Sequence, residues 1–309
     1  MDIFDNLFDT LKLTGALYFQ TDFSPPWSIQ VPELEAAARF HLVVQGNCSV
    51  AVADEGAMTL GPGDMILVPR GRPHVIADQS GRPAAALETV LQQAGYDGRG
   101  VLRLPGNNSE AATRLVCGHF SFRRYADHPV LSALPSHLVV TPEMRRASAW
   151  LDDLLRMICQ RVTDGELGAA ASVRRLSEIV FIEVIRGSVA TSGPLGRVLA
   201  GFGDPQIGRA LELIHAEPQR PWSVENLATE VAMSRSAFAD RFRDLVGMSP
   251  IRYLSEWRLQ KALADLSELG PTVQQVAGQA GYQSAAAFSR AFSARFGLSP
   301  LEYRRTLCA

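Results

Sequence analysis

Short apolar runs, separated by glycine, proline and polar residues, dominate the first third of the chain. Each run has the length of a β-strand, and the residues between the runs favour turns, as in all-β barrels and sandwiches. The pattern therefore predicts a β-barrel in this region. The runs are Phe40–Val44, Cys48–Ala53, Met65–Val68, Ala84–Leu91 and Leu115–Phe122.

Ahead of these runs, the first residues of the chain follow a helical period. The apolar positions are Ile3, Phe4, Leu7, Phe8 and Leu11. Their spacing predicts a short amphipathic helix. We expect this helix to cover an open end of the barrel.

After Pro142 the apolar spacing changes to that of two amphipathic helices. The first contains Trp150, Leu151, Leu154, Leu155 and Ile158, and the second contains Val173, Leu176, Ile179, Val180 and Glu183. Such a hairpin either packs on its own domain or offers its apolar stripe to a partner. We expect it to mediate dimerisation through Leu151, Leu155, Ile158, Leu176 and Val180.

The stretch Gly187–Asp204 carries Gly, Ser and Pro without sustained periodicity, so it is predicted to be an interdomain linker. From Pro205 to Ala309 the pattern is helical throughout and contains an internal repeat. Six positions recur 50 residues later, including the G-x-S-P-x-x-Y pattern. The first copy has Phe238, Phe242, Gly247, Ser249, Pro250 and Tyr253, and the second has Phe288, Phe292, Gly297, Ser299, Pro300 and Tyr303.

Each copy of the repeat predicts a helix-turn-helix, and a long helix, Ser249–Leu266, joins the two copies. Ser223 and Thr272 stand where helix N-caps belong. The second helices are predicted over Arg235–Val246 and Ser284–Phe296, with their phenylalanines directed to the core. Small and polar residues occupy the opposite faces, as a helix entering the major groove requires. These candidate DNA-contacting residues are Arg235, Ser236, Ala239, Asp240 and Arg243 in one copy, and Ser284, Ala285, Ser289 and Arg290 in the other.

Composition and charge narrow the class of protein. The chain has 309 residues, 47% of them hydrophobic and 20% charged, which excludes a disordered or disulfide-scaffold protein. The net charge is −2, but twelve Lys and Arg against ten Asp and Glu from Pro205 onward make the C-terminal third mildly basic. We expect no membrane segment and a cytoplasmic location, because no long uncharged apolar run occurs. The four cysteines form no C-x-x-C pair.

The repeat also carries a family resemblance. The segments Trp222–Leu254, Arg258–Ala262 and Val276–Arg305 resemble the DNA-binding domain of AraC/XylS transcriptional regulators. The resemblance implies that the domain reads two adjacent segments of double-stranded promoter DNA, with Arg290 at a position used for bases or adjacent phosphate. We also expect RNA polymerase as a partner, and a homodimer formed through the helical hairpin. Asp240 departs from the family, because some relatives carry a basic contact residue there.

The first domain contains a second motif. Residues 63–74 fit G-x5-P-x-G-x2-H, which resembles the second cupin motif and delivers His74 to the barrel interior. The segment around His41 looks like the remains of the first cupin motif, with Arg39 where a metal-binding Glu is expected. An enzymatic cupin would supply two His and one Glu, so the sequence predicts a protein that is not an enzyme and requires no cofactor. The alternative is a cupin metalloenzyme tethered to a DNA-binding domain.

The segments around Val116–Phe122 and Pro129–Pro135 are similar to the cupin sensor domains of one AraC-type subgroup, some members of which respond to oxidants through cysteine. The candidate sensor residues are His41, His74, Cys117 and His119. Imidazole and thiolate groups suit Zn²⁺ or copper, so the four can form a metal or thiol site. Alternatively, they line the barrel and contact a small organic effector. A reactive Cys117 requires a lowered pKa.

The predicted fold class is therefore α+β with two domains: a cupin-like β-barrel with a helical hairpin, and an all-α double helix-turn-helix domain. The predicted boundaries are 1–140 for the sensor barrel, 141–187 for the hairpin, 188–204 for the linker and 205–309 for the DNA-binding domain. The predicted function is sequence-specific transcriptional regulation in response to a small effector, a metal or an oxidant.

Overall fold

The computed structural model describes residues 3–35, 37–52, 55–98, 100–106, 112–140, 142–164, 167–188, 193–268 and 270–308. The chain forms two compact units. The sheet unit comprises Leu13–Phe122 and Leu134–Gly187, and the helical unit comprises Met1–Lys12, Arg123–Ala133 and Ser188–Ala309. The linear partition predicted from the sequence is therefore replaced by a discontinuous one, in which three segments build the helical unit.

Two sheets form the barrel of the sheet unit, as the strand pattern predicts. The six-stranded sheet has the order β11-β6-β3-β10-β1-β9 and the five-stranded sheet has the order β5-β4-β7-β2-β8. The strands are β1 Thr14–Phe23, β2 Ser28–Val31, β3 Ala37–Gln45, β4 Cys48–Val52, β5 Met58–Leu60, β6 Met65–Val68, β7 His74–Ala77, β8 Ala85–Ala86, β9 Val101–Leu104, β10 Arg114–Ser121 and β11 Leu138–Val140.

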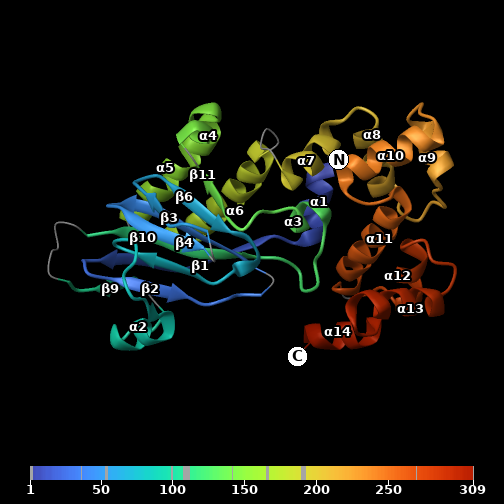
Figure 1. The fold of residues 1–309 in the computed structure, drawn as a ribbon. Coiled ribbons are helices and arrows are strands. Elements are labelled where there is room, and N and C mark those ends of the chain that lie inside the picture. Colours follow the sequence, from blue (N-terminus) through green and yellow to red (C-terminus); the bar gives the residue numbers. More distant parts are fainter. Residues whose placement is uncertain are drawn as a thin grey trace. The chain divides into compact units, whose positions relative to one another are not determined.

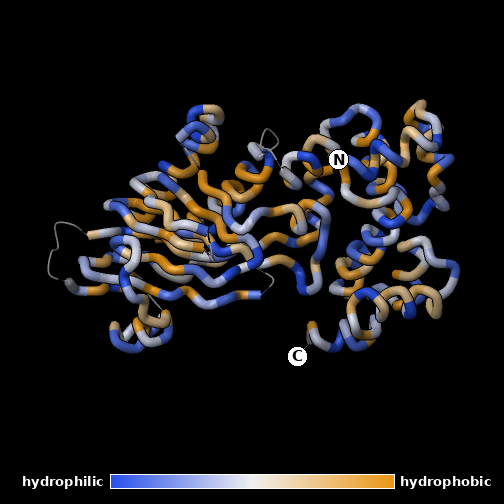
Figure 2. Tube along the Cα trace, viewed as in Figure 1, coloured by the Kyte–Doolittle hydropathy of each residue, from blue (hydrophilic) through white to orange (hydrophobic). Residues whose placement is uncertain are grey.

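Both faces of the six-stranded sheet are covered, and the alternation along β3 and β10 assigns each residue to a face. On one face Phe40 stacks on Phe120 with ring centroids 4.9 Å apart, and Phe120 packs on Phe181 of the helical hairpin. On the other face Val43, Leu115 and Cys117 join the core between the two sheets. The helices of this unit are η1 Pro69–Gly71, α2 Leu87–Gln93, α4 Pro142–Ala147, α5 Ala149–Asp164 and α6 Ala169–Gly187. Figure 2 shows the hydrophobic residues concentrated along these strands and α6.

A tight turn between β6 and β7 explains the glycine of the second motif. Gly71 has φ +56°, and a Cβ placed there would lie 1.9 Å from the carbonyl oxygen of Leu34. The Leu34 N–H donates to the Gly71 carbonyl at 2.9 Å, so the two backbones are held together. Only glycine fits this approach, and the turn brings His74 to the start of β7.

The helical unit holds the repeat with the predicted helices (Figure 1). The Ser223 hydroxyl accepts from Asn226 N–H, and Thr272 forms a capping box with Gln275. Both predicted N-caps are thus confirmed. The helices are α1 Ile3–Leu11, α3 Pro129–Ser132, α7 Pro194–Gly203, α8 Ile207–Ala216, α9 Val224–Glu230, α10 Arg235–Val246, α11 Pro250–Leu266, α12 Val273–Gln279, α13 Ala285–Phe296 and α14 Pro300–Cys308.

Three expectations about individual segments are wrong. Ala84–Leu91 is not a strand: β8 covers only two residues, and α2 begins at Leu87. The predicted linker 188–204 contains α7, whose Leu195 and Leu199 are buried and which packs against α10. The N-terminal helix exists as predicted, but it packs on α8 and α11 and belongs to the helical unit, not to the barrel unit. Residues 189–192 of the expected linker lie outside the described residues.

Candidate functional site

The second helices of the two helix-turn-helix motifs, α10 and α13, have the same construction. Each starts after a serine whose hydroxyl accepts a backbone N–H of the first turn, Ser234 for α10 and Ser284 for α13. Each ends at a glycine with positive φ. The phenylalanines of both helices are fully buried, which leaves the opposite face to solvent. The sequence therefore predicted correctly which face of each helix is exposed.

On α10 the predicted contact residues lie on the exposed face. Arg235, Ser236, Asp240 and Arg243 are exposed and Ala239 is half-buried. Asp240 lies 3.8 Å from Arg243, so it offsets part of the positive charge of this face. The α10 surface is thus less attractive to phosphate than its two arginines alone would make it.

On α13 one predicted contact residue, Ser284, caps the helix, and the others lie along it with different exposure. Ser284 precedes the helix, and its hydroxyl accepts the Ala287 N–H at 3.2 Å. Ala285 and Ser289 are half-buried, whereas Arg290 is exposed. Within the described part of the chain, the Arg290 side chain makes no hydrogen bond or ion pair. Its guanidinium therefore remains available for a ligand.

Two other arginines of the helical unit hold loops in place. Arg258 donates from Nε to the Pro218 carbonyl at 2.6 Å and from a terminal nitrogen to the Arg220 carbonyl at 2.9 Å. Arg304 donates to the carbonyls of Leu266 and Pro271. Two nitrogens of each guanidinium are therefore used within the fold.

A buried chain of hydrogen bonds lies in the barrel interior. His41 on β3 pairs in register with Cys117 on β10, and its Nδ1 lies 3.1 Å from Cys117 Sγ. The other ring nitrogen of His41, Nε2, lies 2.7 Å from Nε2 of His74, which belongs to the other sheet. The last link of this hydrogen-bond chain joins His74 Nδ1 to the Arg72 carbonyl oxygen, at 2.8 Å. The structure thus joins three of the four predicted sensor residues.

The partners fix where the protons lie in the neutral chain. A carbonyl only accepts, so His74 Nδ1–H donates to Arg72 and its Nε2 is bare. His41 Nε2–H then donates to His74, and His41 Nδ1 accepts the Cys117 S–H. Cys117 is therefore a protonated thiol that donates a hydrogen bond.

Burial determines the electrostatics of this chain. Desolvation, with a smaller contribution from Cys48, raises the pKa of the Cys117 thiol above its usual value. Desolvation also lowers the pKa of His74 to about 4, and it lowers the pKa of His41, with His74 and Arg39 adding to the effect. A reactive Cys117 requires a lowered pKa, whereas burial raises the pKa of this thiol, so in this state the thiol keeps its proton.

His119 does not join the chain. It is half-buried and lies opposite Arg39 in the register of β10 and β3. Desolvation and then Arg39 lower its pKa. The two ring nitrogens of His41 bond to different residues, Cys117 and His74, so the four predicted sensor residues do not converge on one ion. Among the described residues, no group of three or more His, Cys, Asp or Glu is arranged to hold a metal.

A narrow cavity adjoins the chain, and His41, Cys117 and Arg39 reach it. Its other walls are mostly apolar, from Phe23, Ile29, Val31, Ile76, Leu87 and Gly118. It has room for about one water molecule in this state. A larger effector must therefore displace part of the wall to reach the thiol.

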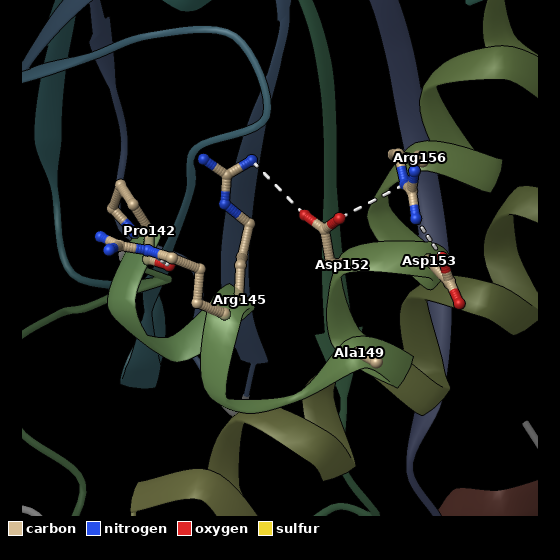
Figure 3. Close-up of a pocket in the computed structure, with 7 residues that line it drawn as sticks. Pro142, Arg145, Ala149, Asp152, Asp153 and Arg156 are labelled. Carbon is tan, nitrogen blue, oxygen red and sulfur yellow. Dashed lines mark hydrogen bonds and ion pairs between the residues drawn. The ribbon is translucent and has the colours of Figure 1, made fainter.

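A second cleft lies at the junction of α4 and α5 and is strongly charged (Figure 3). Arg156 lies 3.3 Å from Asp152 and also contacts Asp153, and Arg145 lies 3.4 Å from Asp64. The carboxylates thus compensate most of the arginine charge, and the cleft does not present a cationic site for an anion.

The hydrogen-bonded residues Cys117, His41 and His74 are called the sensor chain below. The sequence analysis did not identify Arg39 as a buried cation beside this sensor chain. It also missed His128 and Gln260, which are buried and bonded to residues more than a hundred positions away. No local pattern marks these residues, since their partners come from distant segments.

Comparison with known proteins gives matches over almost the whole chain. The family profile described as Cupin matches residues 2–190, and the profile described as Helix-turn-helix domain matches residues 227–306. The HTH-type transcriptional regulator AlkR of Acinetobacter baylyi is 28% identical over 310 residues, which cover 99% of this chain and 99% of the relative. The HTH-type transcriptional regulator MtrA of Neisseria gonorrhoeae is 26% identical and covers 99% of this chain and 98% of its own.

Among solved structures, the DNA-binding domain of AdpA in complex with a target DNA is 32% identical, with a TM-score of 0.32. The match covers 33% of this chain and 92% of that one. No helix in the described part of the chain is both long and apolar enough to cross a bilayer.

Proposed function

This protein belongs to the cupin family and is an AraC/XylS-type transcriptional regulator, and we propose that a change in the hydrogen bonds among Cys117, His41 and His74 in its barrel alters promoter binding by α10 and α13. Relatives that match nearly full length are transcriptional regulators, which supports regulation and gives no support to the metalloenzyme alternative. We therefore assign the chain no enzymatic activity and place its action in the cytoplasm, where promoter DNA and RNA polymerase are its partners.

Arg290 carries the proposed base contact. It is exposed on α13 and is unpaired within the described residues, whereas Arg243 of α10 is partly neutralised by Asp240. An arginine that reaches a guanine edge makes a bidentate hydrogen bond, which discriminates between bases. We assign the other candidates on α10 and α13 to shape complementarity and phosphate contacts.

The sensor proposal rests on the hydrogen-bond chain that crosses the barrel. Cys117 and His41 come from one sheet and His74 from the other, so a molecule that breaks the chain changes how the sheets are joined. A ligand shifts an equilibrium only by its different affinity for two states. An effector larger than the narrow cavity meets this condition, because its entry moves the wall.

We propose that the chain forms a homodimer through the outer face of the hairpin. The stripe predicted from the sequence is wrong as an interface, because Leu151, Leu155, Ile158 and Val180 are buried within the sheet unit and Leu176 is half-buried. The exposed apolar side chains of the hairpin are instead Trp150, Met157, Leu167 and Ile179.

DNA selection tests the DNA-binding part. Purified protein is used to enrich duplexes from a random library, and the enriched sequence is then located by footprinting upstream of the protein's own gene. We expect one sequence with two adjacent segments to be enriched. Enrichment of no sequence, or equal affinity for enriched and random duplexes, would contradict the proposal.

A matched pair of substitutions tests the sensor part. Cys117→Ser keeps a donor to His41, whereas Cys117→Ala removes it. If hydrogen bonding carries the signal, a reporter strain carrying Cys117→Ser responds like wild type and Cys117→Ala does not. If sulfur chemistry carries it, both variants lose the response to hydrogen peroxide while basal DNA binding remains. A normal response of Cys117→Ala to hydrogen peroxide, Zn²⁺ and candidate effectors would exclude Cys117 as a sensor.

A further inference from the structure

The segment Arg123–Ala133, which we call the strap, connects two strands of the sheet unit but belongs to the helical unit. It follows β10, the strand that carries Cys117, and it precedes β11. β11 pairs with β6, and β6 pairs with β3 beside His41. Both ends of the strap are therefore continuous with strands that flank the sensor chain.

The strap runs along one face of α11, the helix between the two helix-turn-helix motifs. Its contacts are at Tyr253 and Gln260 of α11 and at Ser267, the residue at the C-terminal cap of this helix. These positions are seven residues apart and thus lie on one stripe. Arg123 donates to the Ser267 hydroxyl at 2.6 Å, and Asp127 N–H donates to Gln260 Oε1 at 3.1 Å.

The Gln260 side-chain amide bonds the middle of the strap through both its nitrogen and its oxygen. The Gln260 Nε2 donates to the Tyr125 carbonyl at 3.3 Å while its Oε1 accepts from Asp127. Gln260 is 3% exposed, so the two bonds satisfy a buried amide. A buried amide that loses these partners costs about 1–3 kcal/mol, which makes the strap hard to detach.

At its C-terminal half the strap enters a buried aromatic cluster. The Val130 N–H donates to His128 Nδ1, so His128 Nε2–H donates to the Tyr253 hydroxyl at 3.0 Å. The Tyr253 hydroxyl then donates to His215 Nε2 at 2.7 Å, and His215 stacks on Trp257. The strap thus ties α11 to α8 through one shared hydroxyl.

The strap also reaches the second recognition helix. Asp127 pairs with Arg295, which lies in the last turn of α13, and Arg295 also bonds Glu256 of α11 at 2.6 Å. Tyr125 packs beside Phe296 and Tyr303. The strap therefore contacts α13 on the same helix that presents Arg290.

We propose that the strap positions α11 and α13 for DNA binding and transmits a change in the sensor chain to them. The transmission step rests on the proposed function, because it takes the Cys117–His41–His74 chain as the source of the signal. The positioning step depends only on the contacts above. The two steps are therefore tested separately.

Amide hydrogen exchange on the full-length protein, without DNA, tests positioning. Gln260→Met removes both bonds to the strap and keeps the side-chain size, and Asp127→Asn removes the charge opposite Arg295. Glu212→Gln is the matched control, since it breaks an exposed ion pair with Arg209 in α8. We expect exchange in α11 and α13 to rise at least about threefold in the first two variants, with α5, α6 and the control unchanged.

An increase in amide exchange confined to the strap would overturn the proposal, because it would show that α11 stabilises the strap while the strap does not stabilise α11. If Gln260→Met proves too unstable to purify, Asp127→Asn alone decides between these outcomes, since Asp127 is a surface carboxylate.

Lengthening the connection between β10 and the strap tests transmission. The effect of Cys117→Ala is measured in the native protein and in a protein with Gly-Gly-Ser inserted after Phe122. We expect Cys117→Ala to change exchange in the strap and α11 by about twofold or more in the native connection and by much less in the lengthened one. An equal change in both connections, or none in either, would overturn transmission. Neither readout uses DNA, so a failure to enrich any duplex would contradict the proposed function without deciding this test.

Discussion

The imidazoles of His41 and His74 meet at 2.7 Å, Nε2 to Nε2, and they join the two sheets of the barrel. Each ring uses its other nitrogen for a different partner, Cys117 for His41 and the Arg72 carbonyl for His74. The pair is therefore part of a continuous hydrogen-bond chain and not one half of an open metal site. The consequences of this geometry can be measured.

The first prediction concerns acid stability. Burial lowers the pKa of His74 to about 4 in the folded protein, whereas an unfolded histidine titrates near about 6.5. Between these values the unfolded chain binds more protons, so the free energy of unfolding falls as pH falls, by up to about 1.4 kcal/mol per pH unit for this residue. We expect His74→Gln to lose this part of the slope in urea denaturation at about pH 7 and about pH 5.

His137→Gln is the control, because His137 is only half-buried and lies beside Glu55, away from the hydrogen-bond chain. An identical pH dependence in wild type, control and His74→Gln would show that His74 does not contribute to the acid sensitivity.

The second prediction concerns the turn that delivers His74. Gly71→Ala forces a Cβ to within 1.9 Å of the Leu34 carbonyl oxygen at a positive φ, and we expect a loss of more than about 3 kcal/mol in urea denaturation. Gly81→Ala is the matched control, because Gly81 also has positive φ but nothing within 4 Å of the added Cβ. Its cost is limited to backbone strain, about 1–2 kcal/mol. Equal losses would mean that the Leu34 contact relaxes freely.

The third prediction concerns DNA recognition. Arg290→Ala removes the proposed base contact, so affinity for the enriched duplex falls by about 1–3 kcal/mol while affinity for random duplex falls much less. Arg252 is exposed on α11, so Arg252→Ala removes only charge and weakens binding to both duplexes alike. Fluorescence anisotropy titrations at several salt concentrations measure both effects. An equal loss on the two duplexes for Arg290→Ala would rule out base reading by this residue.

The fourth prediction concerns the oligomer. Trp150 is 72% exposed and Ile179 is 45% exposed, so Trp150→Asp with Ile179→Asp leaves the fold intact and gives a monomer by sedimentation. Leu155→Asp instead unfolds the sheet unit, because Leu155 is buried and an unpaired charge cannot be accommodated there. A dimer that survives the first pair of substitutions would place the interface outside the hairpin.

Local patterns in the sequence determined much of this protein. The 50-residue repeat predicted two helix-turn-helix motifs, and the structure has them with Ser223 and Thr272 as N-caps. Helical spacing predicted α1, α5 and α6, and the cupin-like motif predicted the turn before His74. These features follow from residues close in the chain, because helix periodicity, capping and turn chemistry are short-range properties.

Only the tertiary structure decided which segments belong together and what the polar residues do. Arg258 is one of the basic residues of the C-terminal third, but two carbonyls from a distant loop accept hydrogen bonds from its guanidinium. Cys117 is a thiol that donates to His41, because strand pairing places the two side by side in the buried interior. The strap joins α11 through Gln260, a residue with no local signal. Hydrogen-bond partners and desolvation depend on groups far apart in sequence, and so periodicity and motifs cannot specify them.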